Sequence, residues 1–153
     1  MLGLEPGTCG YMATSYRSPL EIAPDGGARR TIGQALYFLV TLKARVRLHR
    51  IGSDQVYHHY AGDPLEVLLF PEDRAPHIAV VGPDLSAGHR PQLLIPGGTF
   101  HTGRVLPGGC SALLGTTSWP GVADGEFEWG DAAALATRYP AVAGILAEMA
   151  ADD

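Results

Sequence analysis

The chain has 153 residues, of which 46% are hydrophobic and 18% charged, and its formal net charge is −5. This length and composition are those of a globular protein with a substantial core, and they exclude a disordered chain. Lys43 is the only lysine and the arginines are scattered, so the sequence predicts no nucleic-acid partner. No apolar run reaches the roughly 20 residues that cross a bilayer, so no membrane partner is expected either.

Two cysteines bear on the cellular environment. Cys9 and Cys110 are far apart in sequence, and neither belongs to a CxxC pair. A cysteine-based zinc site or a disulfide framework is therefore not expected. The N-terminal residues also lack the basic and apolar segments of a signal peptide. We therefore predict a reduced, cytoplasmic protein.

Glycine and proline separate many short apolar runs, which is typical of a chain with many short strands. An edge strand is expected over Tyr11–Ser18. The further strands are expected at Gln34–Thr41, Ala44–Arg50, Gln55–Ala61, Leu65–Phe70, His77–Val81, Pro91–Ile95, His101–Val105 and Ala112–Thr117. Strands of this length and spacing predict an antiparallel sandwich or barrel.

The C-terminal part has helical character. Asp131 is a suitable N-cap for a short helix that ends at Tyr139, before a proline. A second helix is expected over Ala141–Ala150, with an apolar stripe that includes Leu146 and Met149. We expect the pair to cover one end of the barrel. With no linker or repeat, residues 1–153 are predicted to form a single domain, with the barrel at about 11–128 and the helical tail at about 131–150.

The segment from Arg47 to Gly62, RLHRIGSDQVYHHYAG, has the outline of the first metal-binding motif of cupin barrels. That motif reads His-x-His, a short turn, Glu, six residues and Gly. Here His49 is retained, whereas Arg47 replaces the first His and Gln55 replaces the Glu. The second cupin motif, Pro-x-Gly-x-x-His, is matched by the segment that ends at His101. If this register holds, His101 lies across the barrel from His49.

Further segments extend the resemblance over nearly the whole chain. They are Tyr16-Arg17-Ser18, Leu36-Tyr37-Phe38-Leu39, His49-Arg50, Ser53-Asp54-Gln55, Tyr57 to Leu65, Gly82-Pro83-Asp84-Leu85, Arg90-Pro91-Gln92, Pro96-Gly97-Gly98-Thr99, Phe127-Glu128, Gly130-Asp131 and Arg138-Tyr139-Pro140. In these segments the chain resembles an uncharacterised family of the cupin superfamily, related in fold to sugar-nucleotide 3,5-epimerases. The resemblance implies an all-β, double-stranded β-helix (jelly-roll) barrel with short C-terminal helices. It also implies a homodimer formed through the N-terminal strands and a pocket for a small polar ligand.

Strand alternation indicates which side chains share the pocket. Arg47 and His49 are expected on one face of their strand, and Gln55, Tyr57 and His59 on one face of the next. In the cupin register all five look into the barrel. One interpretation is a metal site, in which His49, His101 and His59 bind Zn, Fe, Ni or Mn. Arg47 and Gln55 oppose that reading, because they replace two expected ligands with a cation and a neutral amide.

The alternative interpretation needs no cofactor. His49, His59, His101 or Tyr57 would act as general acid or base, since imidazole titrates near neutral pH. Arg47 would bind a carboxylate, phosphate or enolate oxygen of the substrate, with Gln55 beside it. This pattern predicts isomerase, epimerase, cyclase or lyase chemistry on a small organic substrate, such as a step in a biosynthetic pathway. A binding protein without catalysis and a metal-dependent enzyme remain open alternatives.

The N-terminal segment departs from its relatives, which carry a His and two acidic residues between Pro6 and Ser18. Tyr11 and Met12 stand in the altered stretch, and Tyr37 follows in the next strand. We expect these three side chains to contact the substrate, in a pocket adapted to a less charged ligand. Packing is the competing role for each of them.

Overall fold

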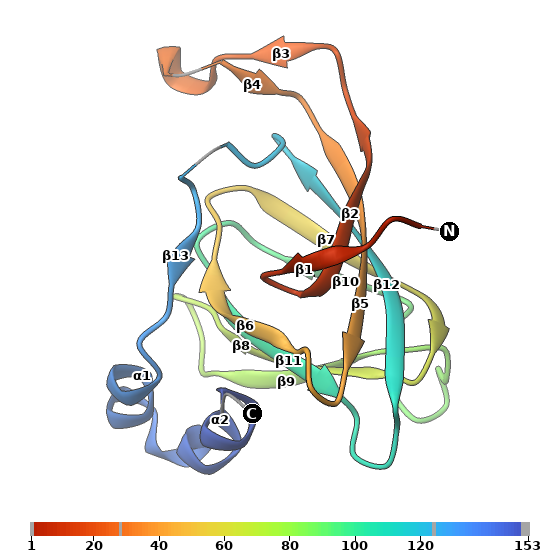
Figure 1. Cartoon of the computed structure of the whole chain (residues 1–153). Coiled ribbons are helices and arrows are strands. Elements are labelled where there is room, and N and C mark those ends of the chain that lie inside the picture. Colours follow the sequence, from red (N-terminus) through yellow and green to blue (C-terminus); the bar gives the residue numbers. More distant parts are fainter. Residues whose placement is uncertain (1, 28, 124, 151–153) are drawn as a thin grey trace.

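The computed structural model describes residues 2–27, 29–123 and 125–150. Two antiparallel sheets face each other and enclose the main core, and the helices lie beside the smaller sheet (Figure 1). This is the predicted jelly-roll architecture. Among the described residues the sheets are not joined into one closed ladder. Isolated bridges link them instead, Cys9 with Val46 on one side and Val81 with Arg90 on the other.

The larger sheet has six strands in the order β1-β2-β5-β12-β7-β10. Their bounds are Glu5–Gly7, Gly10–Arg17, Gln34–Thr41, Ser111–Trp119, Asp54–Gly62 and Gln92–Ile95. The expected strand at Tyr11–Ser18 is present as β2 but is not at the edge, because β1 turns back and pairs with it. The sequence of β1, Glu-Pro-Gly, contains proline and glycine and therefore did not predict a strand.

The smaller sheet has five strands in the order β13-β6-β11-β8-β9. Their bounds are Glu128–Trp129, Val46–Arg50, Phe100–Val105, Leu65–Phe70 and His77–Val81. A two-stranded extension, β3 (Glu21–Ile22) and β4 (Arg30–Thr31), carries the 3-10 helix η1 (Pro24–Gly26) and projects from the far end in Figure 1. The short strands β1, β3, β4 and β13 were not predicted, because two or three residues carry no alternation signal.

Two apolar clusters hold the fold together. The first fills the space between the sheets and includes Phe38, Tyr57, Val67 and Leu114. The second lies on the outer face of the smaller sheet, because Leu68 on β8 points away from its buried neighbour Val67. Burying these side chains provides the main stabilisation of both faces.

The helices cover that outer face. They are α1 (Ala132–Arg138), the 3-10 turn η2 (Pro140–Val142) and α2 (Ala143–Ala150). Asp131 caps α1 as predicted, since its carboxylate accepts a hydrogen bond from the backbone N–H of Ala134 at 3.0 Å. Leu146 and Met149 pack on Leu48 and Leu68. The tail thus covers a sheet face rather than closing one end of the barrel. No helix of the described part is long and apolar enough to span a membrane.

Candidate functional site

A buried polar cluster lies between the sheets, at the level where β6 and β11 pair. His49 of β6 stands directly opposite His101 of β11, and their ring centroids are 4.4 Å apart. His49 is 1% exposed and His101 is fully buried. Gln55 and Tyr57 reach the same cluster from β7 of the facing sheet and are also buried. The sequence prediction that these four residues share a site is consistent with this placement.

Backbone carbonyls orient both imidazole rings. Nδ1 of His49 lies 2.6 Å from the carbonyl oxygen of Arg47, and Nδ1 of His101 lies 3.1 Å from that of Thr99. A carbonyl only accepts, so each Nδ1 carries the proton and each Nε2 is the basic atom. In each case the carbonyl belongs to the residue two positions earlier in the strand.

Tyr57 connects His101 to Cys9. Its hydroxyl lies 3.0 Å from Nε2 of His101 and therefore donates to it. The Gln55 amide nitrogen is 3.4 Å from the same Nε2, and the thiol of Cys9 is 3.7 Å from the Tyr57 oxygen. The direction of donation is then from Cys9 to Tyr57 to His101. Neither the involvement of Cys9 nor this order was evident from the sequence, because Cys9 lies in the turn between β1 and β2.

Burial keeps the four titratable side chains of this cluster neutral. They are His49, His101, Tyr57 and Cys9. Burial, together with a smaller effect of the neighbouring His49, lowers the pKa of His101 to about 3. Burial is also the main cause that lowers the pKa of His49. For the acids the same desolvation acts in the other direction, raising the pKa of Cys9 to about 12 and that of Tyr57 well above its usual value. At neutral pH the cluster therefore holds two free bases and a protonated phenol.

Two further hydroxyls lie at this end of the interior. The side-chain oxygens of Ser53 and Ser118 are buried and have no hydrogen-bond partner among the described residues. Ser118 pairs in register with Gln55, and Ser53 precedes Gln55 by two positions. Buried polar atoms without partners are costly, so these hydroxyls suit a polar ligand that would satisfy them.

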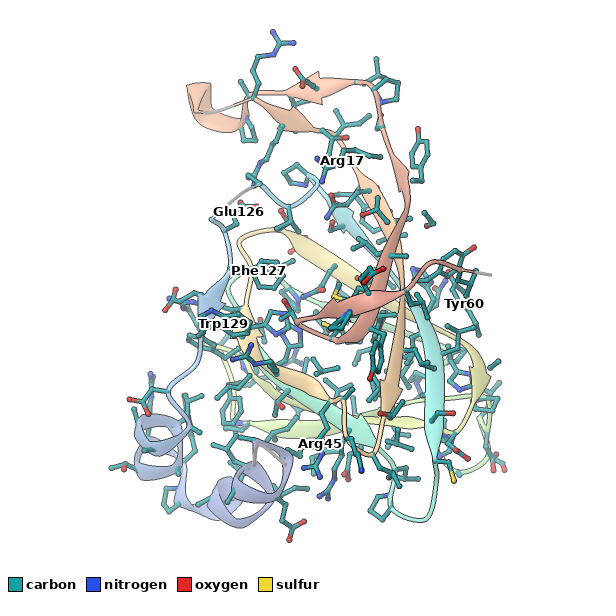
Figure 2. All side chains as sticks on the ribbon, in the orientation of Figure 1. Arg17, Arg45, Tyr60, Glu126, Phe127 and Trp129 are labelled. Atoms are coloured by element: carbon teal, nitrogen blue, oxygen red, sulfur yellow. The ribbon has the colours of Figure 1, made fainter. Side chains whose placement is uncertain are left out.

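An aromatic cover lies over His49. The Phe127 ring stacks on the His49 ring at a centroid distance of 5.2 Å, and Trp129 meets it edge-on at 6.4 Å. Figure 2 shows both residues on the segment that contains β13 and leads toward the helices. Ion pairs hold this segment at two points, between Glu126 and Arg30 and between Glu128 and Arg50.

Arg47 does not look into the barrel. The pairing of β6 with β11 shifts register between His101 and Gly103, which places a bulge next to Arg47. Strand alternation fails at a bulge, so Val46 and His49 are both buried while Arg47 is exposed. Its guanidinium lies 4.2 Å from the Trp129 ring centroid. The expectation that Arg47 shares the interior face with His49 was therefore wrong.

His59 also lies apart from the histidine pair. Its side chain lies on the same face of β7 as those of Gln55 and Tyr57. His59 is farther along the strand, however, and is only half-buried there. Its Nε2 lies 3.2 Å from the carbonyl oxygen of Asp63. Within the described residues it makes no hydrogen bond or ring contact with His49 or His101.

The predicted substrate-contacting residues of the N-terminal part are distributed over different surfaces. Met12 packs against the interior cluster. Tyr37 lies on the outer face of the larger sheet, where its ring contacts Tyr60 at 5.9 Å, because Phe38 takes the interior position. Tyr11 is exposed and lines a separate pocket beside β6. None of the three reaches the histidine pair.

The donors around His49 and His101 do not fit a resident divalent metal. They are two imidazoles, an amide and a protonated phenol, and none of these is anionic. No group of three His, Cys, Asp or Glu side chains suited to hold a metal occurs in residues 2–27, 29–123 and 125–150. Without a carboxylate the charge of the cation would remain uncompensated. The main reason that the site does not suit a metal is Gln55, a neutral amide at the position of the cupin glutamate.

Comparison with known proteins identifies the family. Residues 1–130 match the family described as Cupin superfamily (DUF985). The chain belongs to this cupin family. No curated protein matches the chain.

Two solved structures are similar over almost the full length of this cupin. A hypothetical protein from Leishmania major is 27% identical, with 97% of this chain and 94% of that chain covered and a TM-score of 0.86. A protein from Shewanella oneidensis is also 27% identical, with 99% and 94% covered and a TM-score of 0.85. A dTDP sugar isomerase from Desulfovibrio desulfuricans shares the fold at 16% identity, with 78% and 83% covered and a TM-score of 0.55.

Proposed function

We propose that this cupin performs non-redox acid/base chemistry on a small organic substrate, of the isomerase, epimerase, cyclase or lyase type. The observation that carries the proposal is the pair of neutral histidines, each held with Nε2 as its basic atom, beside a protonated tyrosine. Such a set can remove a proton from carbon and return one to a different atom. The dTDP sugar isomerase of similar fold supports the reaction class.

The two histidines have different environments, which suggests different roles. Nε2 of His101 is engaged by the hydroxyl of Tyr57, whereas Nε2 of His49 makes no hydrogen bond among the described residues. We assign His49 as the base that accepts a proton from the substrate. Tyr57 would turn its single proton from Nε2 of His101 to the developing oxyanion or carbanion when the substrate binds. Gln55, Ser53 and Ser118 would bind the polar groups of the substrate.

Access to His49 requires the aromatic cover to open. Phe127 stacks directly on the imidazole, and the strand that follows it, β13, pairs with β6 over only two residues. Such a short ladder separates at low cost compared with the long pairs of the larger sheet. Closure after binding would exclude water from the acid/base pair, which strengthens its interactions with the substrate.

The acid/base proposal is tested by hydrogen exchange at carbon. The protein in D2O is incubated with carbonyl compounds that have an acidic α-C–H bond, including dTDP-linked keto sugars, and deuterium incorporation is followed by NMR. We expect incorporation into at least one of them, and loss of it in His49→Gln. His77→Gln, at a half-buried histidine of β9 outside the cluster, is the matched control. Binding of a compound without exchange would favour the alternative of a non-catalytic binding cupin.

We also propose that the protein is a homodimer through the outer face of the larger sheet. Tyr16, Tyr60 and Trp119 are exposed there despite their size. A patch of exposed aromatic side chains is typical of an interface. Tyr16→Lys should produce a monomer in sedimentation velocity, whereas Leu85→Lys, at an exposed turn position, should not. A wild-type protein that sediments as a monomer would contradict this proposal.

A further inference from the structure

A second concave site lies outside the barrel interior, along the exposed edge of β6. It is a pocket of about 410 Å³ between the β1–β2 hairpin, the turn that precedes β6, and the segment from Trp129 to the end of α2. The hairpin pairs with β6 at Val46, and Gly130 bonds to β6 at Leu48, so the pocket occupies the gap between these two contacts. A volume of this size accommodates a small organic molecule.

Three cations line the pocket. Lys43, Arg45 and Arg47 occupy alternate positions in the chain, and among the described residues that line the pocket none is acidic. Arg45, labelled in Figure 2, is held by carbonyl oxygens, at 3.3 Å from that of Leu42 and 2.6 Å from that of Glu148. A positive pocket in a chain of net charge −5 is a specific feature and not a reflection of the whole surface.

Lys43 and Arg47 differ from most other cations of the protein. Within the described residues neither makes an ion pair or a side-chain hydrogen bond to protein. Several arginines elsewhere have acidic partners, for example Arg29 with Glu21, Arg30 with Glu126, Arg50 with Glu128 and Arg104 with Glu66. The donors of Lys43 and Arg47 are therefore available to a ligand.

Aromatic side chains complete the pocket. Trp129 lies under the guanidinium of Arg47, at 4.2 Å, and holds it by a cation–π contact. Tyr11 lines the same pocket from β2. A ligand held by the cations would thus place its organic part next to two rings.

We propose that this pocket binds an organic phosphate, with the phosphate between Lys43 and Arg47 and the organic part against Trp129 and Tyr11. A dianion matches two separate unpaired cations better than a monoanionic carboxylate does, and a guanidinium presents paired donors to phosphate oxygens. This site is distinct from the histidine cluster, because neither His49 nor His101 lines the pocket, although Trp129 borders both sites. The proposal therefore does not depend on the acid/base chemistry.

Binding is tested with phenyl phosphate, inorganic phosphate and benzoate as probes, by isothermal titration calorimetry. The indole N–H signals of the two tryptophans provide a second readout by NMR. We expect phenyl phosphate to bind more tightly than either other probe, and its binding to shift the signal of Trp129 and not that of Trp119. Arg47→Gln and Lys43→Gln should each weaken binding about tenfold, as expected for the loss of one charge-assisted contact.

Control variants separate this site from the rest of the protein. Arg74→Gln removes an exposed arginine far from the pocket, and His101→Gln alters the interior cluster. Both should bind phenyl phosphate like the wild type, and the folded state of each variant is checked by its NMR spectrum. The proposal is overturned if phenyl phosphate does not bind, if benzoate binds equally well, or if Arg47→Gln binds it like Arg74→Gln.

Discussion

His49 and His101 face each other across neighbouring antiparallel strands, with ring centroids 4.4 Å apart and each Nδ1 held by the carbonyl two residues earlier. Two bases this close cannot both be protonated without strong repulsion. The same carbonyl contact on both strands fixes both rings in one tautomer. This relationship explains why the pair can act as free bases in a buried site, and it determines the response of the protein to acid.

Acid should destabilise the protein through His101. Its pKa is about 3 in the folded protein, below the ordinary value of 6.5, so the unfolded chain binds a proton that the folded chain excludes. The stability contributed by neutral His101 is complete above about pH 6.5 and is lost as pH falls toward 3, at up to about 1.4 kcal/mol per pH unit. Denaturant unfolding at several pH values should show this slope, and His101→Gln should reduce it. An unchanged slope would mean that other groups cause it.

Opening the aromatic cover should expose His49. Phe127→Ala removes the ring stacked on His49, so water reaches the imidazole and its lowered pKa should move up toward the ordinary value. NMR titration of the histidine signals measures this change. Trp119→Phe, at an exposed ring of the other sheet, should leave the His49 titration unaltered. Equal titration in wild type and Phe127→Ala would show that Phe127 does not shield His49.

A carboxylate at position 55 should create a metal site. Gln55→Glu places an anionic oxygen beside Nε2 of His101, where the wild type has only neutral donors. We expect this variant to bind Ni²⁺ or Zn²⁺ much more tightly than the wild type in calorimetric titrations. Gln92→Glu adds the same charge at an exposed site and should have no such effect. Tight stoichiometric binding by the wild type would contradict our assignment of the site as unsuited to metal.

The helical tail should contribute to stability through one buried contact. Leu146 is 1% exposed and packs in the cluster between α2 and the smaller sheet. Leu146→Ala leaves a cavity there and should lower the free energy of unfolding by about 3 kcal/mol. Leu85→Ala, at a residue that is 64% exposed, should change it by less than about 0.5 kcal/mol. Similar losses in both variants would show that the tail does not stabilise the sheet.

Much of the fold was predictable, and the reasons lie in the strand pattern. Gln34–Thr41, Leu65–Phe70 and His77–Val81 have the predicted bounds, because punctuating turn residues flank clear apolar runs. The resemblance to the cupin motifs implied that His49 and His101 lie close together, but they pair on neighbouring strands of one sheet and do not face each other across the barrel. The direction of the Arg47 side chain could not be predicted, because it depends on a departure from strict strand alternation. The bulge in β6 turns this side chain outward.

Residues that reach the site from short or irregular segments were also beyond the sequence pattern. Cys9 enters from a turn, and Phe127 enters from a segment next to a two-residue strand. Such segments have no periodicity, so only the tertiary structure shows which way their side chains point. For His59 the strand alternation predicted the correct face of β7. Its position farther along the strand nevertheless separates it from His49 and His101.

The central claim is that the histidine pair performs proton transfer without a metal. It is tested most directly by deuterium incorporation from D2O into an α-C–H bond of a carbonyl compound, catalysed by protein stripped with a chelator and checked for metal content. The account predicts that incorporation is retained after stripping and is lost in His49→Gln and His101→Gln. Incorporation that disappears on stripping and returns with added metal, or that persists in both variants, would contradict it.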